Sequence, residues 1–320
     1  MMFVYVYDGG SVRRADRVEP QWLDPASSAI LWVDLADPSP DELAVLSDVF
    51  RFHSLAIDDA TSALQFPKVE QYPGFLYVVL HRLGRPNAGR SIETRDVDFF
   101  VTRNALVTVH QGESRQLAHV RELCDRHDRA LAEGPVALLH RIVDLLVDNY
   151  RPAMEDIEAR LEKLEEEAFA GHDQMGRKVL RVKRELAQLR RVLIPQRDVV
   201  GRLARREFPA VTDDLTYRFR DVYDHLVRLT EETILFQDRV TGIFEVNLST
   251  VSNRLNQVMK LLTVMSTIFL PLTVLTGMWG MNIGLPHFPG GDDAQFAWVA
   301  GIMLVLVGAM LALFRRMRWI

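Results

Sequence analysis

The chain has 320 residues, of which 25% are charged, and its formal net charge at pH 7 is −5. Because this balance is slightly acidic, no excess of basic side chains is available to neutralise nucleic-acid phosphates, and no nucleic-acid partner is expected. The single cysteine, Cys124, excludes a disulfide within the chain and a site built from several thiolates, which fits a reducing compartment.

The N-terminal part of the sequence predicts strands that alternate with short helices. Its strand candidates are short, rich in β-branched and aromatic residues, and bounded by turn residues. They are Phe3–Tyr7, Ile30–Asp34, Phe75–Leu80, Val97–Val101 and Ala105–His110. Between them, Ser39 is a candidate helix N-cap and Pro40 a candidate first helical residue. We therefore expect an α/β domain, a sandwich of modest size, over residues 1–133.

Residues 134–260 are strongly charged and predict long helices. One apolar stripe recurs at steps of three and four residues from Leu138 to Leu164, and a second, basic helix is expected from Met175 to about Arg206. Their opposite charge and the short break between them favour an antiparallel hairpin. A third helical pattern begins at Leu215 and meets no strong breaker before Pro271, a length that indicates a stalk.

Two segments near the C-terminus have the character of membrane-spanning helices. Leu261–Trp279 and Phe296–Phe314 are each about 19 residues long and uncharged, and roughly 20 apolar residues span a ~30 Å hydrocarbon core. Basic residues flank the pair, whereas the connecting loop 280–295 has neither Lys nor Arg. Because positive residues stay on the cytoplasmic side, we expect a multi-pass membrane protein. Both termini would be cytoplasmic, including the basic tail 315–320, and the loop would lie outside.

A polar stripe follows the first membrane segment. Its members lie three or four residues apart and share one helical face: Asn256, Met259, Thr263, Ser266, Leu270, Thr273 and Gly277. The stripe combines amides, hydroxyls and a glycine with apolar side chains large enough to close a pore, whereas the second segment is uniformly apolar. Serine and threonine are also common at helix contacts in membranes. Because two helices cannot enclose an aqueous path, a pore would require several copies around one axis.

The tripeptide Gly280-Met281-Asn282 directly follows the first apolar segment and precedes a short loop and a second, C-terminal apolar segment. In this position it resembles the signature of the CorA-type magnesium transporter family. Four further stretches are similar to the cytoplasmic domain, the stalk and the basic tail of that family: 59–80, 219–224, 248–256 and 315–319. The resemblance covers most of the chain.

This resemblance implies a funnel-shaped homopentamer embedded in the lipid bilayer of the plasma (inner) membrane, with the residues 261–279 lining its pore and the residues 296–314 outside them. Gly280, Met281 and Asn282 would form the selectivity ring at the outer entrance. The implied pore-lining residues are Glu245, Asn256, Met259, Leu262, Thr263, Ser266, Leu270, Thr273 and Gly277. Because Mg²⁺ gives up its waters reluctantly, a ring of neutral oxygens can hold the hydrated ion without binding it too tightly to leave.

The resemblance also assigns Asp59 and Asp221 to a regulatory divalent-ion site between neighbouring subunits. An ion bound there would favour a symmetric closed state through its higher affinity for that state. In the outer loop, the sequence departs from the acidic Met-Pro-Glu form that many family members have. Asp292 and Asp293 are expected to raise the local cation concentration instead.

The sequence therefore favours passive Mg²⁺ uptake, with Mg²⁺ as transported and regulatory ion and Co²⁺ or Ni²⁺ as further cargo. The first alternative is a proton-coupled transporter for Zn²⁺ or another transition metal in the same superfamily. Such ions prefer imidazole and thiolate ligands, which the polar stripe lacks. The second alternative is a membrane-anchored helical scaffold without transport. The sequence has no phosphate-binding glycine loop, nucleophile elbow or zinc-binding His-Glu spacing, so neither an enzyme nor an organic substrate is expected.

Overall fold

The structure is a computed structural model that describes residues 1–24, 26–62, 65–84, 92–126, 129, 131–170, 175–281 and 291–319. The chain divides into two compact units. The first comprises Met1–Glu167 and Asp173–Phe244, and the second comprises the chain from Glu245 onward together with the last turn of helix α5.

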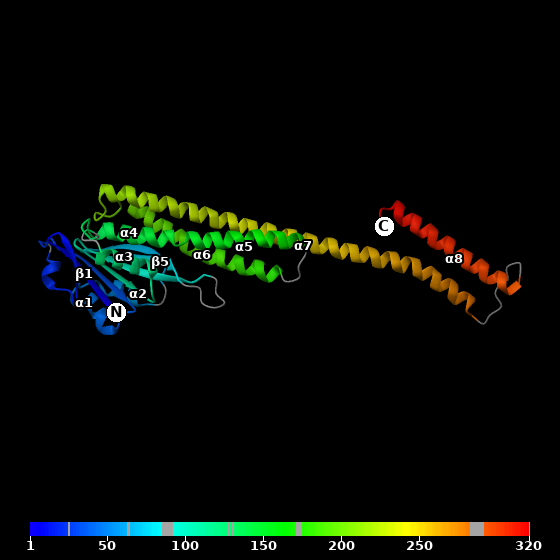
Figure 1. Cartoon of the computed structure of the whole chain (residues 1–320), viewed down its shortest axis with the longest axis horizontal. Helices are drawn as coiled ribbons and strands as arrows, with labels where there is room; N and C mark the ends of the chain where they lie inside the picture. Colours follow the sequence, from blue (N-terminus) through cyan, green and yellow to red (C-terminus); the bar gives the residue numbers. More distant parts are fainter. Residues whose placement is uncertain are drawn as a thin grey trace. The chain divides into compact units, whose positions relative to one another are not determined.

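A seven-stranded sheet forms the centre of the first unit (Figure 1). Its strands are β1 (Met2–Asp8), β2 (Ser11–Ala15), β3 (Ile30–Ala36), β4 (Lys68–Tyr72), β5 (Phe75–Leu83), β6 (Thr94–Val101) and β7 (Ala105–His110). The strand order is β2-β1-β3-β7-β6-β5-β4, and only β3 and β7 pair in parallel. The five inner strands confirm the sequence prediction. The edge strands β2 and β4 escaped it because they carry charged side chains, as edge strands commonly do.

Helices cover both faces of the sheet and continue beyond it. They are the 3-10 helix η1 (Pro20–Leu23), α1 (Pro40–Asp48), α2 (Ser54–Thr61), α3 (Arg115–Arg126), α4 (Pro135–Asp148), α5 (Arg151–Ala170) and α6 (Met175–Ala204). On one face, Leu46 of α1 and Ala56 of α2 join the core formed by alternate strand residues such as Val33 and Val107. Ser39 is the predicted N-cap of α1, and its hydroxyl accepts a hydrogen bond from the Glu42 backbone N–H at 3.3 Å.

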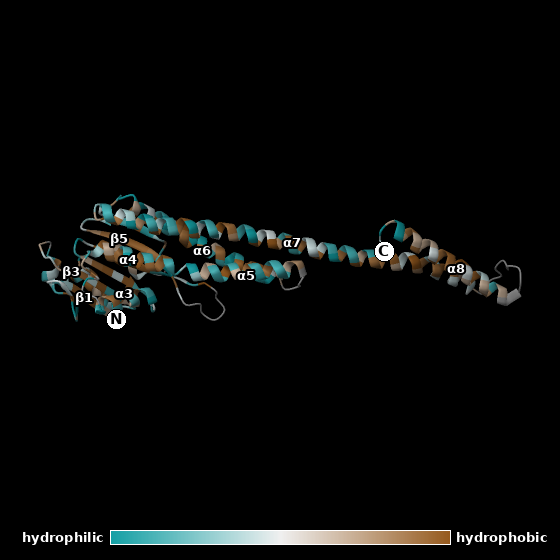
Figure 2. Cartoon of the chain, turned by 45° about the horizontal axis from the view of Figure 1, so that its top comes forward, coloured by the Kyte–Doolittle hydropathy of each residue, from teal (hydrophilic) through white to brown (hydrophobic). Residues whose placement is uncertain are grey.

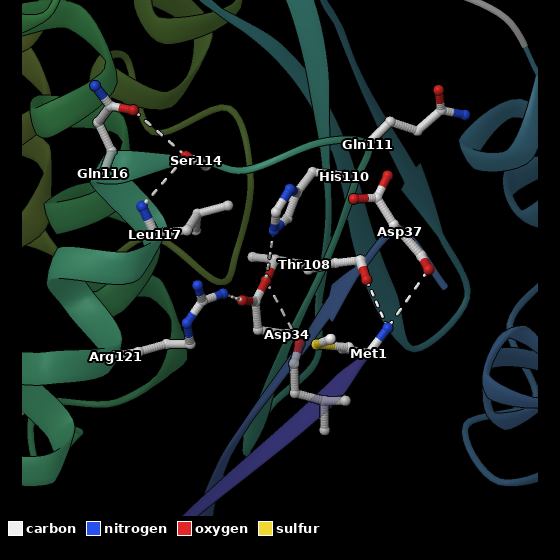
Figure 3. A network of polar contacts seen from close by, with 12 residues as sticks. Met1, Asp34, Asp37, Thr108, His110, Gln111, Ser114, Gln116, Leu117 and Arg121 are labelled. Atoms are coloured by element: carbon white, nitrogen blue, oxygen red, sulfur yellow. Dashed lines mark hydrogen bonds and ion pairs between the residues drawn. The ribbon is translucent and has the colours of Figure 1, made fainter. Parts of the chain in front are cut away.

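A buried polar network joins the other face of the sheet to α3 (Figure 3). Asp34 is fully buried and its Oδ1 accepts a hydrogen bond from the Thr108 hydroxyl at 2.6 Å, while His110 Nε2 lies 3.3 Å away. Arg121 of α3 forms an ion pair with Oδ2 of the same carboxylate. Burial alone would raise the pKa of Asp34, but the hydrogen bond and charge of His110, with Thr108 and Arg121, lower it below its usual range. The ionised Asp34 thereby fixes α3 against β3 and β7.

The apolar stripe predicted from Leu138 to Leu164 belongs to two helices. It is interrupted between α4 and α5, where Tyr150 is fully buried and its hydroxyl donates to the backbone oxygen of His81 at 3.0 Å. The predicted pairing of an acidic with a basic helix is confirmed for α5 and α6, because Glu167 accepts from Lys178 at 2.6 Å.

The second unit contains the predicted membrane segments. Helix α7 (Asp213–Trp279) is continuous over 67 residues, and α8 (Gly291–Arg316) follows it. Two helical stretches of the described residues, Asp213–Trp279 and Ala294–Arg316, are long and apolar enough to cross a membrane. Apolar colouring predominates along α8 and the last part of α7 (Figure 2). The stalk and the first membrane segment are thus one uninterrupted helix.

Candidate ion pathway and cation-binding sites

The polar stripe lies on one face of α7, as the sequence predicts. At 3.6 residues per turn, the predicted pore-lining positions fall within an arc of about 120° around the helix. They are Glu245, Asn256, Met259, Leu262, Thr263, Ser266, Leu270, Thr273 and Gly277, and all are exposed in the single chain. Leu270, an apolar side chain, has 67% of its surface exposed. Such a face mixes polar and apolar side chains, so neither water nor lipid suits it along its whole length. This mixture favours an arrangement in which several copies of the chain turn the face toward a common axis.

Two threonines on this face use their protons within the helix. The hydroxyl of Thr263 donates to the backbone oxygen of Met259 at 2.7 Å, and that of Thr273 donates to Phe269 at 2.8 Å. The oxygen lone pairs of both side chains therefore remain available on the outside of the helix. Such neutral acceptors can bind the water shell of a cation without becoming its direct ligands.

The residues of the expected entrance ring stand at the C-terminal end of α7. Gly280 donates its N–H to the backbone oxygen of Thr276 at 2.9 Å, and Met281 is 56% exposed. Asn282 lies outside the described residues. Asp292 and Asp293 are in the first turn of α8, but their side chains are outside the described part of the structure.

In the first unit, Asp59 sits near the end of α2 and is paired with a cation. The ammonium group of Lys68 on β4 lies 2.5 Å from its Oδ2. Asp221 on α7 is more open, with a side chain that is 74% exposed, and its Oδ1 lies 4.0 Å from Nε2 of His225. The contacts recorded among the described residues do not bring Asp59 and Asp221 together within one chain.

A cluster that the sequence analysis missed lies beside Asp221. Asp144 and Asp148 of α4 and His225 of α7 each offer one ligand atom, and these atoms all lie within 4.8 Å of one another. Burial raises the pKa of Asp144, and the neighbouring charge of Asp148 raises it further. This mutual repulsion is relieved when a cation binds. Asp148 and His225 also line a groove of about 460 Å³ between α4, α5 and α7.

The signal for this cluster was present in the sequence as two helical spacings. Asp144 and Asp148 are four residues apart, as are Asp221 and His225, so each pair shares a helix face. Only the packing of α4 against α7 reveals that the two faces meet.

The chain is similar in sequence to known proteins. The sequence model of the family described as "CorA-like Mg2+ transporter protein" matches residues 27–316. The Bacillus subtilis protein YfjQ is 35% identical over 90% of this chain and 89% of its own length. The "Cobalt/magnesium transport protein CorA" of Thermotoga maritima is 30% identical over 92% of this chain and 84% of its own.

The fold is also shared with a solved structure over the full length of both chains. The complete CorA magnesium transporter from Methanocaldococcus jannaschii superposes with a TM-score of 0.84, covering 100% of this chain and 99% of that one. The sequence identity of this pair is 23%. The α/β domain, the long helix and the two C-terminal apolar helices are therefore one conserved architecture.

Proposed function

This chain belongs to the CorA-like Mg2+ transporter family, and from that premise we propose that it forms a homopentameric channel for passive Mg²⁺ uptake. Family membership makes it a membrane transporter of divalent cations with a soluble N-terminal domain. The ion, the subunit number, the orientation and the gating belong to the proposal. The domain boundaries expected from the sequence remain part of it too.

The observation that carries the proposal is the exposed polar face of α7, which runs directly into Gly280 and Met281. Around a five-fold axis this face would line a path of amide, hydroxyl and apolar rings, with Leu262 and Leu270 at constrictions. It contains no imidazole or thiolate, the ligands that zinc and similar ions prefer. Neutral oxygens instead suit Mg²⁺, which keeps several of its waters.

The proposed direction of transport follows from the charge of the ion. With both termini cytoplasmic, Mg²⁺ would enter down an inside-negative potential. A doubly charged ion gains about 4.6 kcal/mol per 100 mV across the whole field. No proton gradient is needed, and Co²⁺ and Ni²⁺ could share the path.

For gating, we propose that cytoplasmic Mg²⁺ binds between subunits at Asp59 and Asp221, and that Asp144, Asp148 and His225 extend this site. The carboxylates repel one another when the site is empty and are bridged when it is occupied. Because such binding would be tighter in the symmetric closed state, rising cytoplasmic Mg²⁺ would shift the population toward closure.

Flux into proteoliposomes tests this function. Wild-type protein should import Mg²⁺ under an inside-negative potential, and Asn282→Ala and Thr263→Ala should reduce that import. Thr250→Ala is the matched control, because Thr250 lies on the opposite side of α7 and its hydroxyl is also bonded within the helix, to Val246 at 3.0 Å. Zinc uptake that follows a pH gradient, with Mg²⁺ excluded, would move the protein to the transition-metal alternative. Absence of any cation flux would favour the scaffold alternative.

A further inference from the structure

The exposed surface of α6 is almost entirely cationic over most of its length. Residues 175–196 contain seven lysines and arginines, all of them exposed, but only one acidic residue. That residue, Glu185, is buried and pairs with Arg160 of α5 at 2.5 Å. Among the seven cations, Lys178 alone has an ion-pair partner in the described part of the chain. The other six positive charges are therefore not compensated by any described acidic side chain.

An apolar stripe runs between these cations. Its members are spaced seven residues apart, so they share one side of the helix: Leu180, Ala187 and Ile194. Leu180 is 51% exposed. Cations edge the stripe at steps of three and four residues from its members: Lys183 and Arg190 on one side, Arg184 and Arg191 on the other. An apolar line between two charged edges is typical of a helix that docks lengthwise on another protein surface.

The groove between α4, α5 and α7 has a complementary pattern. Leu229, Leu235 and Phe236 give it apolar lining, and Leu235 is 58% exposed. Acidic residues line the groove from both α5 and α7: Glu155, Glu158 and Glu232. Glu155 and Glu232 form no ion pair with any described residue, whereas Glu158 lies 3.9 Å from Arg239. The groove thus offers apolar surface between two acidic edges.

The charges of the two surfaces also correspond along the helices. Two ion pairs fix the alignment of α6 with α5: Lys178 with Glu167, and Arg160 with Glu185. In this alignment Arg191 is level with Glu155, and Arg184 is level with Glu162, an exposed residue two turns farther along α5. Rotation about an axis parallel to the helices keeps each residue at its level. The same oppositely charged residues would therefore meet between two copies of the chain.

The groove is not acidic along its whole length. Arg151 and Arg228 line it near the start of α5. In the same alignment, this end is closest to Asp198 of α6, an exposed acidic residue that pairs with Arg197 at 2.9 Å. The cationic end of the groove thus corresponds to a part of α6 whose charges are balanced.

Beyond this point α6 leads to the part of the chain that carries Asp59. Arg202 of α6 donates to the backbone oxygen of Val69 on β4 at 3.0 Å, and the preceding residue, Lys68, pairs with Asp59. On α7, Asp221 lies one turn before His225, which lines the groove. Docking of α6 in the groove of another copy would therefore bring Asp59 of one subunit toward Asp221 of the next.

We propose that the cationic face of α6 docks into this groove on the next copy of the chain, an inference that rests on the proposed ring of subunits. Helices α5 and α6 both run alongside α7 (Figure 1). They pack on different sides of it, because Arg239 pairs with Glu165 of α5, whereas Gln237 accepts from Arg190 of α6 at 3.2 Å. Each copy could then present α6 to one neighbour and the groove to the other, the head-to-tail contact that closes a ring.

This contact leaves the proposed pore face free. The groove residues of α7 are His225, Arg228, Leu229, Glu232, Leu235 and Phe236. By helical periodicity along the continuous α7, they lie roughly opposite the pore-lining positions. A ring held together by α6 and the groove can therefore turn the polar face of α7 toward its axis.

Disulfide cross-linking of the full-length protein in detergent tests the contact. One cysteine replaces Ala187 in the middle of the apolar stripe, and a second replaces Leu235 in the groove. Oxidation of Ala187→Cys/Leu235→Cys should link separate subunits into a ladder on a denaturing gel. Burial raises the pKa of the native Cys124 thiol to about 12, so the wild type should form no such links. Ala187→Cys/Lys163→Cys is the matched control, because Lys163 is exposed on α5 but does not line the groove.

Charge reversal tests the expected ion pair. In the chain with both cysteines, Arg184→Glu should lower the linked fraction roughly five-fold, since a surface ion pair contributes up to about that factor. Glu162→Arg should lower it similarly, and the two reversals together should restore it. Arg181→Glu is the control, because Arg181 follows Lys178 by three residues on the side of α6 that faces α5 of the same chain. Recovery in the double reversal separates loss of the contact from loss of the fold.

Several outcomes would overturn the proposal. They are an absence of links between subunits, equal linking in the control with Lys163→Cys, an equal loss with Arg181→Glu, and no recovery in the double reversal. An anionic membrane is the rival occupant of the cationic face. In that case the cysteine at position 187 would stay unlinked. It would also be shielded from a water-soluble maleimide in phosphatidylglycerol nanodiscs, but not in phosphatidylcholine nanodiscs.

The cross-linking readout is independent of transport. Links between subunits in a protein that moves no cation would sustain the interface and refute the channel. Cation flux by a protein whose introduced cysteines do not link would sustain the channel and refute the interface.

Discussion

The ammonium group of Lys68 lies 2.5 Å from Oδ2 of Asp59, so the carboxylate assigned to regulation is already neutralised within its own chain. Burial would lower the pKa of Lys68, but the hydrogen bond from Lys68 to Asp59 and the charge of Glu70 raise it above its usual range. A divalent cation that binds Asp59 must therefore compete with a firmly protonated lysine. The affinity of the proposed regulatory site is set partly by this internal competitor.

Replacing Lys68 by glutamine should strengthen regulatory Mg²⁺ binding. Loss of one adjacent positive charge near the surface should lower the Mg²⁺ concentration that protects the full-length protein from protease by about five-fold. Lys163→Gln, a cation on the exposed side of α5, is the control. If Lys68→Gln and wild type require the same Mg²⁺ concentration, Asp59 is not a ligand.

Replacing His225 by alanine should weaken the binding of Co²⁺ and Ni²⁺ more than the binding of Mg²⁺ at the cluster with Asp144 and Asp148. Imidazole is a preferred ligand for Co²⁺ and Ni²⁺, whereas Mg²⁺ prefers carboxylate and water oxygens. The thermal stabilisation that Co²⁺ confers on the full chain should therefore shrink strongly, while that conferred by Mg²⁺ changes little. His119→Ala, a histidine on α3, is the comparison. Equal losses for the two ions would contradict coordination by the imidazole.

Gly280→Ala should reduce flux although the substitution adds only one methyl group. A Cβ at this position would lie 3.1 Å from the backbone oxygen of Thr276, closer than ordinary contact. The end of α7 must shift, and we expect Mg²⁺ flux to fall roughly tenfold, equivalent to about 1.4 kcal/mol in the barrier. At Gly301 of α8 an added Cβ meets nothing within 4 Å in the single chain. Gly301→Ala should thus keep its flux, and equal flux in both variants would refute the steric argument.

The stability of the α/β domain should fall as the pH rises from about 4 to about 8. Asp98 is buried beneath the hydroxyl of Tyr77, which donates to its Oδ1 at 2.5 Å, and burial raises the pKa of Asp98 to about 8. The unfolded chain releases this proton near pH 4, whereas the folded chain keeps it until about pH 8. The stability contribution is therefore complete below pH 4 and lost as the pH rises through the folded pKa.

Asp98→Asn provides the check on that pH dependence. The amide remains neutral at every pH and can still accept from Tyr77. The free energy of unfolding of the full chain, measured with a chemical denaturant, should therefore change less with pH between 4 and 8. A slope identical to that of the wild type would show that Asp98 is ionised in the folded protein.

The sequence by itself determined the elements whose signal is local. Hydrophobic segments without charges predicted both membrane helices, and runs of β-branched residues predicted the five inner strands. In each case the signal lies in consecutive residues of the element itself. The N-cap at Ser39 is equally local. Neighbouring glycine, methionine and asparagine at the end of the first membrane segment carried the family resemblance for the same reason.

Only the tertiary structure decided which distant side chains meet. The break between α4 and α5 depends on Tyr150 reaching the backbone of His81, 69 residues away, and the ligand atoms of Asp144 and His225 meet because α4 packs near α7. The pairing of Asp59 with Lys68 is likewise a contact between separate elements. The apolar periodicity predicts which face of a helix or strand is buried. It does not predict which other element packs on that face, because many partners satisfy the same apolar pattern.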